Sequence, residues 1–378
     1  MRQFTKLPAV DRPADSRDAD RLAYFRLCLD AYLDAERGAS GSIDHHLRVA
    51  DQTIRLRFAG DALVDRIMPA FAHLETDGSP NPDLTICLWD SASTRRELPL
   101  LISSLVRLLK MTWLDERGIR GEIFDYNSNR IRTALHGYEV DMLSSVDLEE
   151  NLGIFWISDA ATLPYYETGA PLRSILQWWF ARAGRQIVHA GATGTGTGGI
   201  LLAGKGGSGK STAALTCLDS SLSYAGDDYT LITTDPAPFV HSLYNTAKVK
   251  GAADLARFPL LVDRVSNQDR IGPDGEKPMM FIHEYAPMKT ISGFPLKAIV
   301  FPRYIAGSGP GCKVIPISPD SAFKALAPST ITQLPGAGAD SMRVMSTLVR
   351  QVPSFLVGFG EDRSEIARTL LNLLATHQ

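Results

Sequence analysis

The stretch that decides the fold runs from residue 204 to residue 211 and reads Gly204-Lys205-Gly206-Gly207-Ser208-Gly209-Lys210-Ser211. It matches the phosphate-binding pattern G-x-x-x-x-G-K-[ST], and a chance match in a chain of this length is on the order of one per cent. The apolar run at 199–203 is typical of a buried strand, and residues 211–218 suit the first turns of a helix. Strand, glycine loop and helix follow one another in the order that phosphate binding requires, so the sequence predicts an α/β nucleotide-binding domain with a P-loop.

The chemistry of this loop indicates its ligand. Glycines let backbone N–H groups converge on phosphate oxygens, and the helix that follows adds its partial positive charge. Lys210 would reach the outer phosphates and the Ser211 hydroxyl would ligate Mg²⁺, so ATP and Mg²⁺ are the expected cofactors. The alternative is a glycine-rich turn that ends in Lys-Ser by chance. The residues expected to contact the nucleotide are Gly204, Lys205, Gly206, Gly207, Ser208, Gly209, Lys210, Ser211 and Thr212.

Two adjacent carboxylates, Asp227 and Asp228, follow a moderately apolar stretch and precede a predicted strand at 229–233. Carboxylates beside the terminal phosphates of a nucleotide can hold Mg²⁺, and one of them can accept the proton of an attacking hydroxyl. Neighbours on an extended strand point to opposite faces, so the two aspartates need different roles or a local twist. The alternative is a solvated turn at a strand edge.

His189 is a third candidate, on the apolar stretch 187–191. A lone histidine on such a strand is more often a satisfied structural residue, but its ordinary pKa near 6.5 would suit it to tuning a nearby carboxylate. Downstream, Gly194, Gly196 and Gly199 satisfy G-x-G-x-x-G, the dinucleotide fingerprint. That fingerprint must open a helix, whereas here it leads into a strand, so we expect a hairpin between two strands and no nicotinamide cofactor.

Composition restricts the class of protein. The 378 residues allow two domains, and a net charge of −3 does not favour a nucleic-acid-binding surface. The cysteines are scattered, without metal-ligand spacing, and are typical of free thiols in a reducing cytosol: Cys28, Cys87, Cys217 and Cys312. No apolar stretch approaches the ~18 residues of a membrane span. The sequence therefore predicts a cytoplasmic protein without membrane or nucleic-acid partners.

Periodicity predicts an α+β accessory domain over residues 1–165, with a loose leader at 10–20 and a boundary near Pro164. Helices are expected at 21–36, 98–113, 172–183 and 363–375. Strands are expected at 48–58, 83–89, 122–124, 131–135 and 153–157. The paired Trp178 and Trp179 are interpreted as core packing in preference to a stacking platform.

Together, Val188-His189-Ala190, the loop at 204–211 and the pair Asp227-Asp228 resemble the HPr serine kinase family, whose fold belongs to the phosphoenolpyruvate-carboxykinase-like group. The interval between the loop and the aspartate pair has room for one helix only, as in that family. The resemblance covers residues 186–234 and implies that residues 166–378 form a kinase domain. It also makes a homo-oligomer plausible.

The resemblance implies a role for each site residue. Asp228 would be the general base for an acceptor hydroxyl, and Asp227 would help to hold Mg²⁺ or position its neighbour. His189 would support the reaction. Lys210 would stabilise charge on the transferred phosphoryl group, and Ser211 would bind the metal. The expected activity is transfer of the ATP γ-phosphoryl group to a serine of a peptide or small protein.

The chain also departs from the family. Its metal-binding glutamate in E-[IV]-R-G has no counterpart in Lys248-Val249-Lys250-Gly251, so HPr as substrate and the reverse reaction are not expected. Lys248, Lys250 and Arg303 are lesser candidates for facing phosphate or an acidic substrate. Two alternative functions stay open, a kinase for a free small molecule and a nucleotide-dependent regulatory or assembly ATPase.

Overall fold

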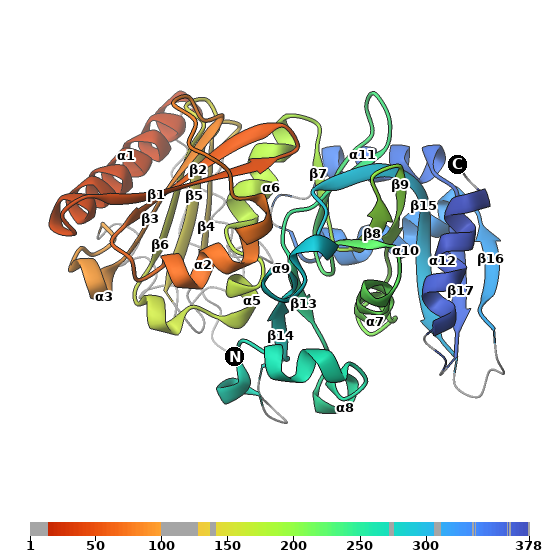
Figure 1. Cartoon of the computed structure of the whole chain (residues 1–378). Helices are drawn as coiled ribbons and strands as arrows, with labels where there is room; N and C mark the ends of the chain where they lie inside the picture. Colours follow the sequence, from red (N-terminus) through yellow and green to blue (C-terminus); the bar gives the residue numbers. More distant parts are fainter. Residues whose placement is uncertain are drawn as a thin grey trace, which may run out of the picture.

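The computed structural model describes residues 14–99, 128–136, 141–271, 276–305, 311–334, 336, 338–360, 362 and 364–376. These residues form two large β-sheets with helices on both faces, and Figure 1 shows the two sheets side by side. Both sheets mix parallel and antiparallel strands, so the α/β class is confirmed at this level. Across these ranges, no helix is both long and apolar enough to cross a membrane.

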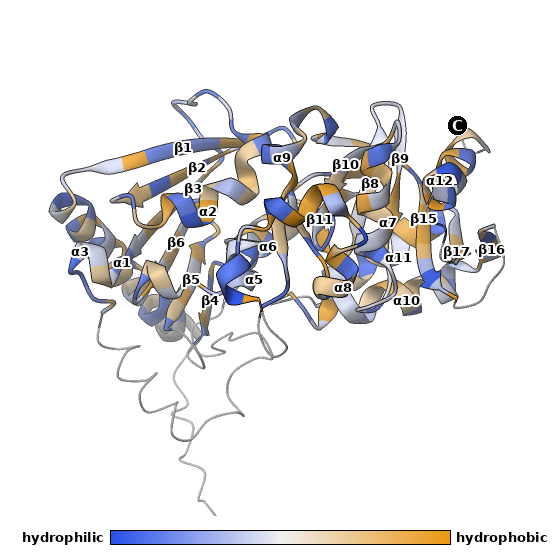
Figure 2. Ribbon diagram, turned by 60° about the horizontal axis from the view of Figure 1, so that its bottom comes forward, coloured by the Kyte–Doolittle hydropathy of each residue, from blue (hydrophilic) through white to orange (hydrophobic). Residues whose placement is uncertain are grey.

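The first sheet has six strands. Their order in space is β1 (Ser42–Val49), β2 (Gln52–Ala59), β3 (Leu84–Asp90), β6 (Leu152–Ile157), β5 (Met142–Asp147) and β4 (Ile131–His136). β3 is parallel to β2 and β6, and the other neighbours are antiparallel. Helix α1 (Ala14–Gly38) covers one face, while α2 (Val64–Phe71) and α6 (Arg173–Arg182) cover the other. Figure 2 colours these elements by hydropathy, and their buried apolar residues form two hydrophobic clusters, one on each face of the sheet.

The first strands differ from the sequence prediction. One strand was expected from residue 48 to residue 58, but the chain turns at Ala50-Asp51 and forms the β1–β2 hairpin. Both turn residues have positive φ, 49° and 67°, which is the geometry of a tight two-residue hairpin turn. Neither is the glycine or asparagine that usually announces such a turn, so the sequence carried no signal for it. Similarly, α1 begins at Ala14, inside the segment expected to be a loose leader.

The second sheet carries the glycine loop. Its path is β10 (Ser223–Gly226), β8 (Gly191–Thr195), β9 (Gly198–Leu202), β15 (Gly293–Tyr304), β12 (Phe239–His241), β11 (Thr230–Thr233) and β7 (Gln186–Val188). β17 (Ser354–Phe359) joins β15, and β16 (Lys313–Ile317) joins β17. β15 runs parallel to both β9 and β17. A separate antiparallel pair consists of β13 (Thr246–Lys248) and β14 (Met279–Phe281).

Helices cover both faces of this sheet. On one face lie α7 (Lys210–Thr216) and α12 (Ser364–Thr376), and on the other lie α10 (Pro319–Ile331) and α11 (Ala339–Gln351). Strand β9 alternates accordingly, because Ile200 packs with α7 while Leu201 packs with α10 and α11. Among the described residues, the other α-helices are short: α3 (Ser91–Thr94), α5 (Tyr165–Thr168), α8 (Ala252–Leu255) and α9 (Ile282–Tyr285).

Several expected elements can be compared directly. Strands at 83–89, 131–135 and 153–157 and helices at 172–183 and 363–375 are present within a residue or two, whereas β5 was missed. The expected helix at 98–113 and strand at 122–124 lie outside the described residues, apart from the helix's first positions. Trp178 and Trp179 are 4% and 6% exposed and belong to the hydrophobic core, so the core interpretation is confirmed.

The division into two domains stays a prediction. Helix α6, which follows the predicted boundary, packs against β5 of the first sheet and against β7 of the second. The hydrophobic cluster beneath it also takes in Leu231 and Tyr244 from the second half of the chain. The apolar core is therefore continuous across residue 165.

The glycines of the G-x-G-x-x-G segment have a packing role. They lie in the β8–β9 hairpin, as expected, with Gly194 paired to Gly199. A Cβ on Gly199 would lie 2.3 Å from Cε2 of Phe294, whose ring covers the hairpin, whereas a Cβ on Gly196 would meet open space. Glycine is therefore needed at position 199 because the ring of Phe294 approaches the backbone closely, and this packing explains the glycine without a bound dinucleotide.

We expect Gly199→Ala to lower the free energy of unfolding by about 1–3 kcal/mol, because the added methyl group overpacks the contact with Phe294. Gly196→Ala, in the turn of the same hairpin, is the matched control and should change the free energy of unfolding far less. Urea denaturation of both variants measures the difference. Equal losses in the two variants would show that the ring contact does not require glycine.

Candidate functional site

The glycine loop connects the end of β9 to the start of α7, at the carboxyl edge of two parallel strands. Gly204, Gly207 and Gly209 have φ of +132°, +78° and +104°, which side chains rarely adopt. A Cβ on Gly209 would also lie 2.5 Å from Cζ of Phe359. A Cβ on Gly206 or Gly207 would meet open space, so the backbone is exposed at these two positions of the loop. This is a surface that an anion can approach closely.

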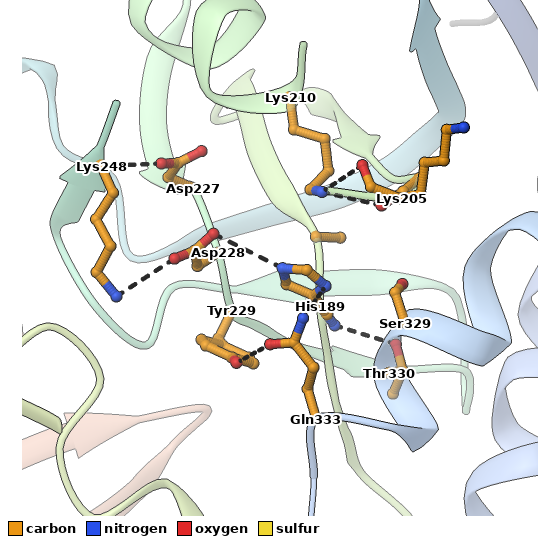
Figure 3. Close-up of polar contacts among 12 residues, drawn as sticks. His189, Lys205, Lys210, Asp227, Asp228, Tyr229, Lys248, Ser329, Thr330 and Gln333 are labelled. Carbon is orange, nitrogen blue, oxygen red and sulfur yellow. Dashed lines mark hydrogen bonds and ion pairs between the residues drawn. The ribbon is translucent and has the colours of Figure 1, made fainter. Parts of the chain in front are cut away.

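Lys210 is the first residue of α7 and is only 6% exposed. Its Nζ donates to the carbonyl oxygens of Gly204, at 2.9 Å, and Lys205, at 3.3 Å. Figure 3 shows these two bonds holding the side chain against its own loop. Burial lowers the pKa of Lys210, while Asp227 and Asp228 oppose that shift. The ammonium group of Lys210 is therefore buried beneath the loop, where it donates hydrogen bonds to two neutral carbonyl groups.

Asp227 follows β10 and is 1% exposed. Its Oδ2 accepts a hydrogen bond from the backbone N of Lys248 at 3.0 Å, whereas its Oδ1 is buried without a partner. Burial, reinforced by the charge of Asp228, raises the pKa of Asp227 to about 7, although Ser211 and Lys210 act in the opposite direction. This carboxylate oxygen, beside the loop serine, is a suitable ligand for a cation.

Asp228 faces a different environment. Its Oδ2 lies 3.3 Å from Nζ of Lys248, its Oδ1 lies 3.7 Å from Nε2 of His189, and its side chain is 31% exposed. Burial favours the protonated form, but Lys248, His189 and Lys210 outweigh it and hold the pKa of Asp228 well below its usual range. The two adjacent aspartates thus differ. They lie in the bend between β10 and β11, with Asp227 buried beside Ser211 and Asp228 half-buried.

His189 lies just after β7, between Asp228 and the end of α10 (Figure 3). Nδ1 of His189 is 3.1 Å from Nε2 of Gln333, and Oε1 of Gln333 accepts a hydrogen bond from the hydroxyl of Tyr229. The backbone N of His189 donates a hydrogen bond to Oγ1 of Thr330. Because the Gln333 amide nitrogen can only donate, Nδ1 is the acceptor and the ring proton sits on Nε2, facing Asp228. Burial lowers the pKa of His189, which favours this neutral form.

The structure brings together the loop, the aspartate pair and His189, the three segments that the resemblance assigned to one site. Of the other loop residues, Ser211 and Thr212 are half-buried at the helix start, Lys205 is exposed, and Oγ of Ser208 is buried without a hydrogen-bond partner. Lys248 joins the group from β13, while Lys250 and Arg303 point to solvent as exposed residues. Gln333 and Thr330 were missed, since nothing in their local sequence marks them as neighbours of His189.

The raised pKa of Asp227 predicts a pH-dependent stability. A carboxyl whose pKa is higher in the folded chain stabilises the fold below its unfolded value, near 4, and this contribution is lost as pH rises toward 7. We therefore expect Asp227→Asn to melt at a temperature that rises relative to wild type between pH 4 and pH 8, by several degrees. Thermal unfolding followed across this range measures the difference.

Asp219→Asn, an exposed carboxylate near the end of α7, is the control and should show a flat difference. A flat curve for Asp227→Asn as well would mean that Asp227 is ionised at low pH in the folded protein.

No family model matches the chain, and no curated protein matches it. Among solved structures, the HPr(Ser) kinase/phosphatase from Coxiella burnetii matches with 9% sequence identity and a TM-score of 0.28, covering 51% of this chain and 95% of that chain. A likeness at this score supports no inference about chemistry, which must come from the residues of the site.

Proposed function

We propose that this chain is an ATP- and Mg²⁺-dependent kinase with a P-loop of the HPr kinase type, acting on the serine hydroxyl of a peptide or small protein. The observation that carries the proposal is the meeting of two separate segments. Ser211 of the loop lies at the buried Asp227, and the charge of Lys210 acts on both aspartates. A cation buried beneath a bare glycine loop, next to a carboxylate with an unpaired oxygen, suits a phosphate–metal ligand.

The residues present fit a magnesium nucleotide. Oδ1 of Asp227 and Oγ of Ser208 are buried polar atoms without partners, and such atoms usually have one. Within the described ranges, no group of three or more His, Cys, Asp or Glu side chains is placed to hold a metal. Ser211 and Asp227 would hold Mg²⁺ together with phosphate oxygens, a common mode for this ion. When bound, Mg²⁺ neutralises negative charge on the phosphates.

Each residue of the candidate site has a role in this reaction. The backbone N–H groups of the loop bind phosphate oxygens, and Lys210 exchanges its two carbonyl partners for the outer phosphates. The acceptor oxygen forms a bond to the γ-phosphorus as the bond to the leaving oxygen breaks, and the hydroxyl proton passes to Asp228. His189, with its Nε2 proton toward Asp228, fixes the orientation of that carboxylate.

The low pKa of Asp228 is compatible with this role. A strongly stabilised carboxylate is a weak base, but phosphoryl transfer proceeds through a loose transition state in which the acceptor is barely deprotonated. Asp228 then serves mainly to orient the hydroxyl and to receive its proton late. Its 31% exposed side chain leaves it accessible to an acceptor arriving from solvent.

The test is incubation with γ-labelled ATP and Mg²⁺, with and without a pool of serine-containing peptides and a panel of small hydroxyl compounds. We expect label on peptide. Label on a small molecule only would retain the kinase and overturn the peptide acceptor. Release of free phosphate alone, at a rate unaffected by Asp228→Asn, would overturn the kinase and favour a hydrolytic regulatory protein.

A further inference from the structure

A cavity lies in the first half of the chain, apart from the glycine loop. It has a volume of about 740 Å³ and lies between α1 and the face of the first sheet that α1 covers, lined by residues of β2, β3 and the turn before β6. Every residue lining it precedes residue 153, so none belongs to the kinase site described above. Cavities of 300–1,000 Å³ are the usual size for small-molecule sites, and this one falls within that range.

Most of the charges in this cavity already have partners. Nε and Nη2 of Arg57 both donate to Oε1 of Glu36, at 2.9 and 2.6 Å. Nη2 of Arg26 lies 3.9 Å from Oε1 of Glu150, at the solvent end. Asp83 accepts a hydrogen bond from the backbone N of Thr53 at 2.7 Å. These pairs leave carboxylates around the cavity that would repel a highly charged anion.

Arg55 is the exception among the charged residues that line this cavity. It extends from β2 on the same face as Arg57 and lines the cavity, but it forms no ion pair with the described residues, and its Nε is buried without a hydrogen-bond partner. The hydroxyl of Tyr32, which lines the same cavity, is also buried without a hydrogen-bond partner, although Arg57 lies near its oxygen. Buried donors that lack acceptors are costly, so their presence around one cavity indicates a ligand that supplies the acceptors.

We propose that this cavity binds a small organic monocarboxylate, with the carboxylate on the guanidinium of Arg55 and within reach of the Tyr32 hydroxyl. The planar guanidinium matches a carboxylate with two parallel hydrogen bonds. Glu36 and Asp83 disfavour a dianion such as a phosphate monoester. Leu33 and Leu152, which also line the cavity, provide an apolar surface for the rest of the ligand.

The site is independent of phosphoryl transfer. It uses the sheet that carries no residue of the candidate kinase site, so its ligand would be a second one, bound while the glycine loop is free or occupied. Nucleotide binding measured in the same samples therefore separates failure of this proposal from failure of the proposed function.

The test uses fluorine NMR of the full chain with para-fluorobenzoate, para-fluorophenylacetate and trifluoropropionate, each paired with its neutral carboxamide. We expect at least one carboxylate, and no carboxamide, to broaden on adding wild-type protein. Arg55→Gln should weaken that binding about tenfold or more, because it removes a charge-assisted hydrogen-bond pair. Arg48→Gln, an exposed arginine on the neighbouring strand β1, is the matched control and should not.

Two further variants keep the test decisive if Arg55→Gln unfolds. Tyr32→Phe removes only the hydroxyl and should weaken binding, and Arg55→Lys keeps the charge but not the fork and should weaken it as well. Binding that is equal in wild type, Arg55→Gln and Tyr32→Phe would overturn the proposal. So would the absence of binding by every carboxylate, or tighter binding of para-fluorophenyl phosphate.

Discussion

Replacing Lys210 by alanine is expected to lower kcat/KM for phosphoryl transfer by about 10²–10³-fold, the loss typical of removing one preorganised donor to developing charge. The physical reason is the position of the Lys210 ammonium group. Its Nζ is buried and held by the carbonyls of Gly204 and Lys205, so it is already positioned beneath the loop, whereas the side chain of Lys205 is exposed to solvent. Steady-state kinetics and nucleotide binding by fluorescence measure the two parts of the loss.

The control for this variant is Lys324→Ala, which removes an exposed lysine from the middle of α10. It changes the net charge by the same amount without touching the loop and should leave kcat/KM near the wild-type value. A Lys210→Ala protein that transferred phosphate at the wild-type rate would remove the loop from the reaction, and with it the proposed function.

Replacing Asp228 by asparagine is expected to lower kcat by about 10²–10⁴-fold, the usual contribution of a positioned acid–base group. Asparagine preserves the size of the side chain but neither pairs with Lys248 nor accepts the hydroxyl proton. Because the variant keeps the loop and removes a charge that raises the pKa of Asp227, affinity for the magnesium nucleotide should not fall below that of wild type. Single-turnover kinetics with separately measured nucleotide affinity distinguish the two effects.

The same site predicts the pH profile of kcat/KM, which reports the groups of the free enzyme. Asp228 is ionised throughout the neutral range because Lys248, His189 and Lys210 hold its pKa low, so it contributes no inflection there. Asp227, with a pKa of about 7, must lose its proton to bind a cation, and kcat/KM should therefore rise with pH through that value. Asp219→Asn, an exposed carboxylate outside the site, should keep both kcat and the profile unchanged. An Asp228→Asn protein with wild-type kcat would overturn the assignment of the base.

Some of the structure was determined locally and could be read from the sequence. Residues 204–211 contain their own reasons for adopting a loop: glycines stand at the positions of positive φ, and Lys210 begins the helix that follows. Alternating apolar residues gave β2 its buried face, because Ile54, Leu56 and Phe58 share one side of a strand and enter one core. Backbone conformation and the two-residue alternation of side chains along a strand depend on only a few neighbouring residues, so a short stretch of sequence is enough to predict them.

Tertiary structure decided the rest. The sequence placed Asp227 and Asp228 together but could not say which is buried, because that depends on Lys248 of β13 and on the packing around Ser211. The proton on Nε2 of His189 depends on Gln333, which lies 144 residues further along the chain. Burial, charge pairing and tautomers are set by neighbours in space. The sequence therefore determined the class of ligand that the loop suits, whereas only the fold decided which carboxylate can hold a cation and which can receive a proton.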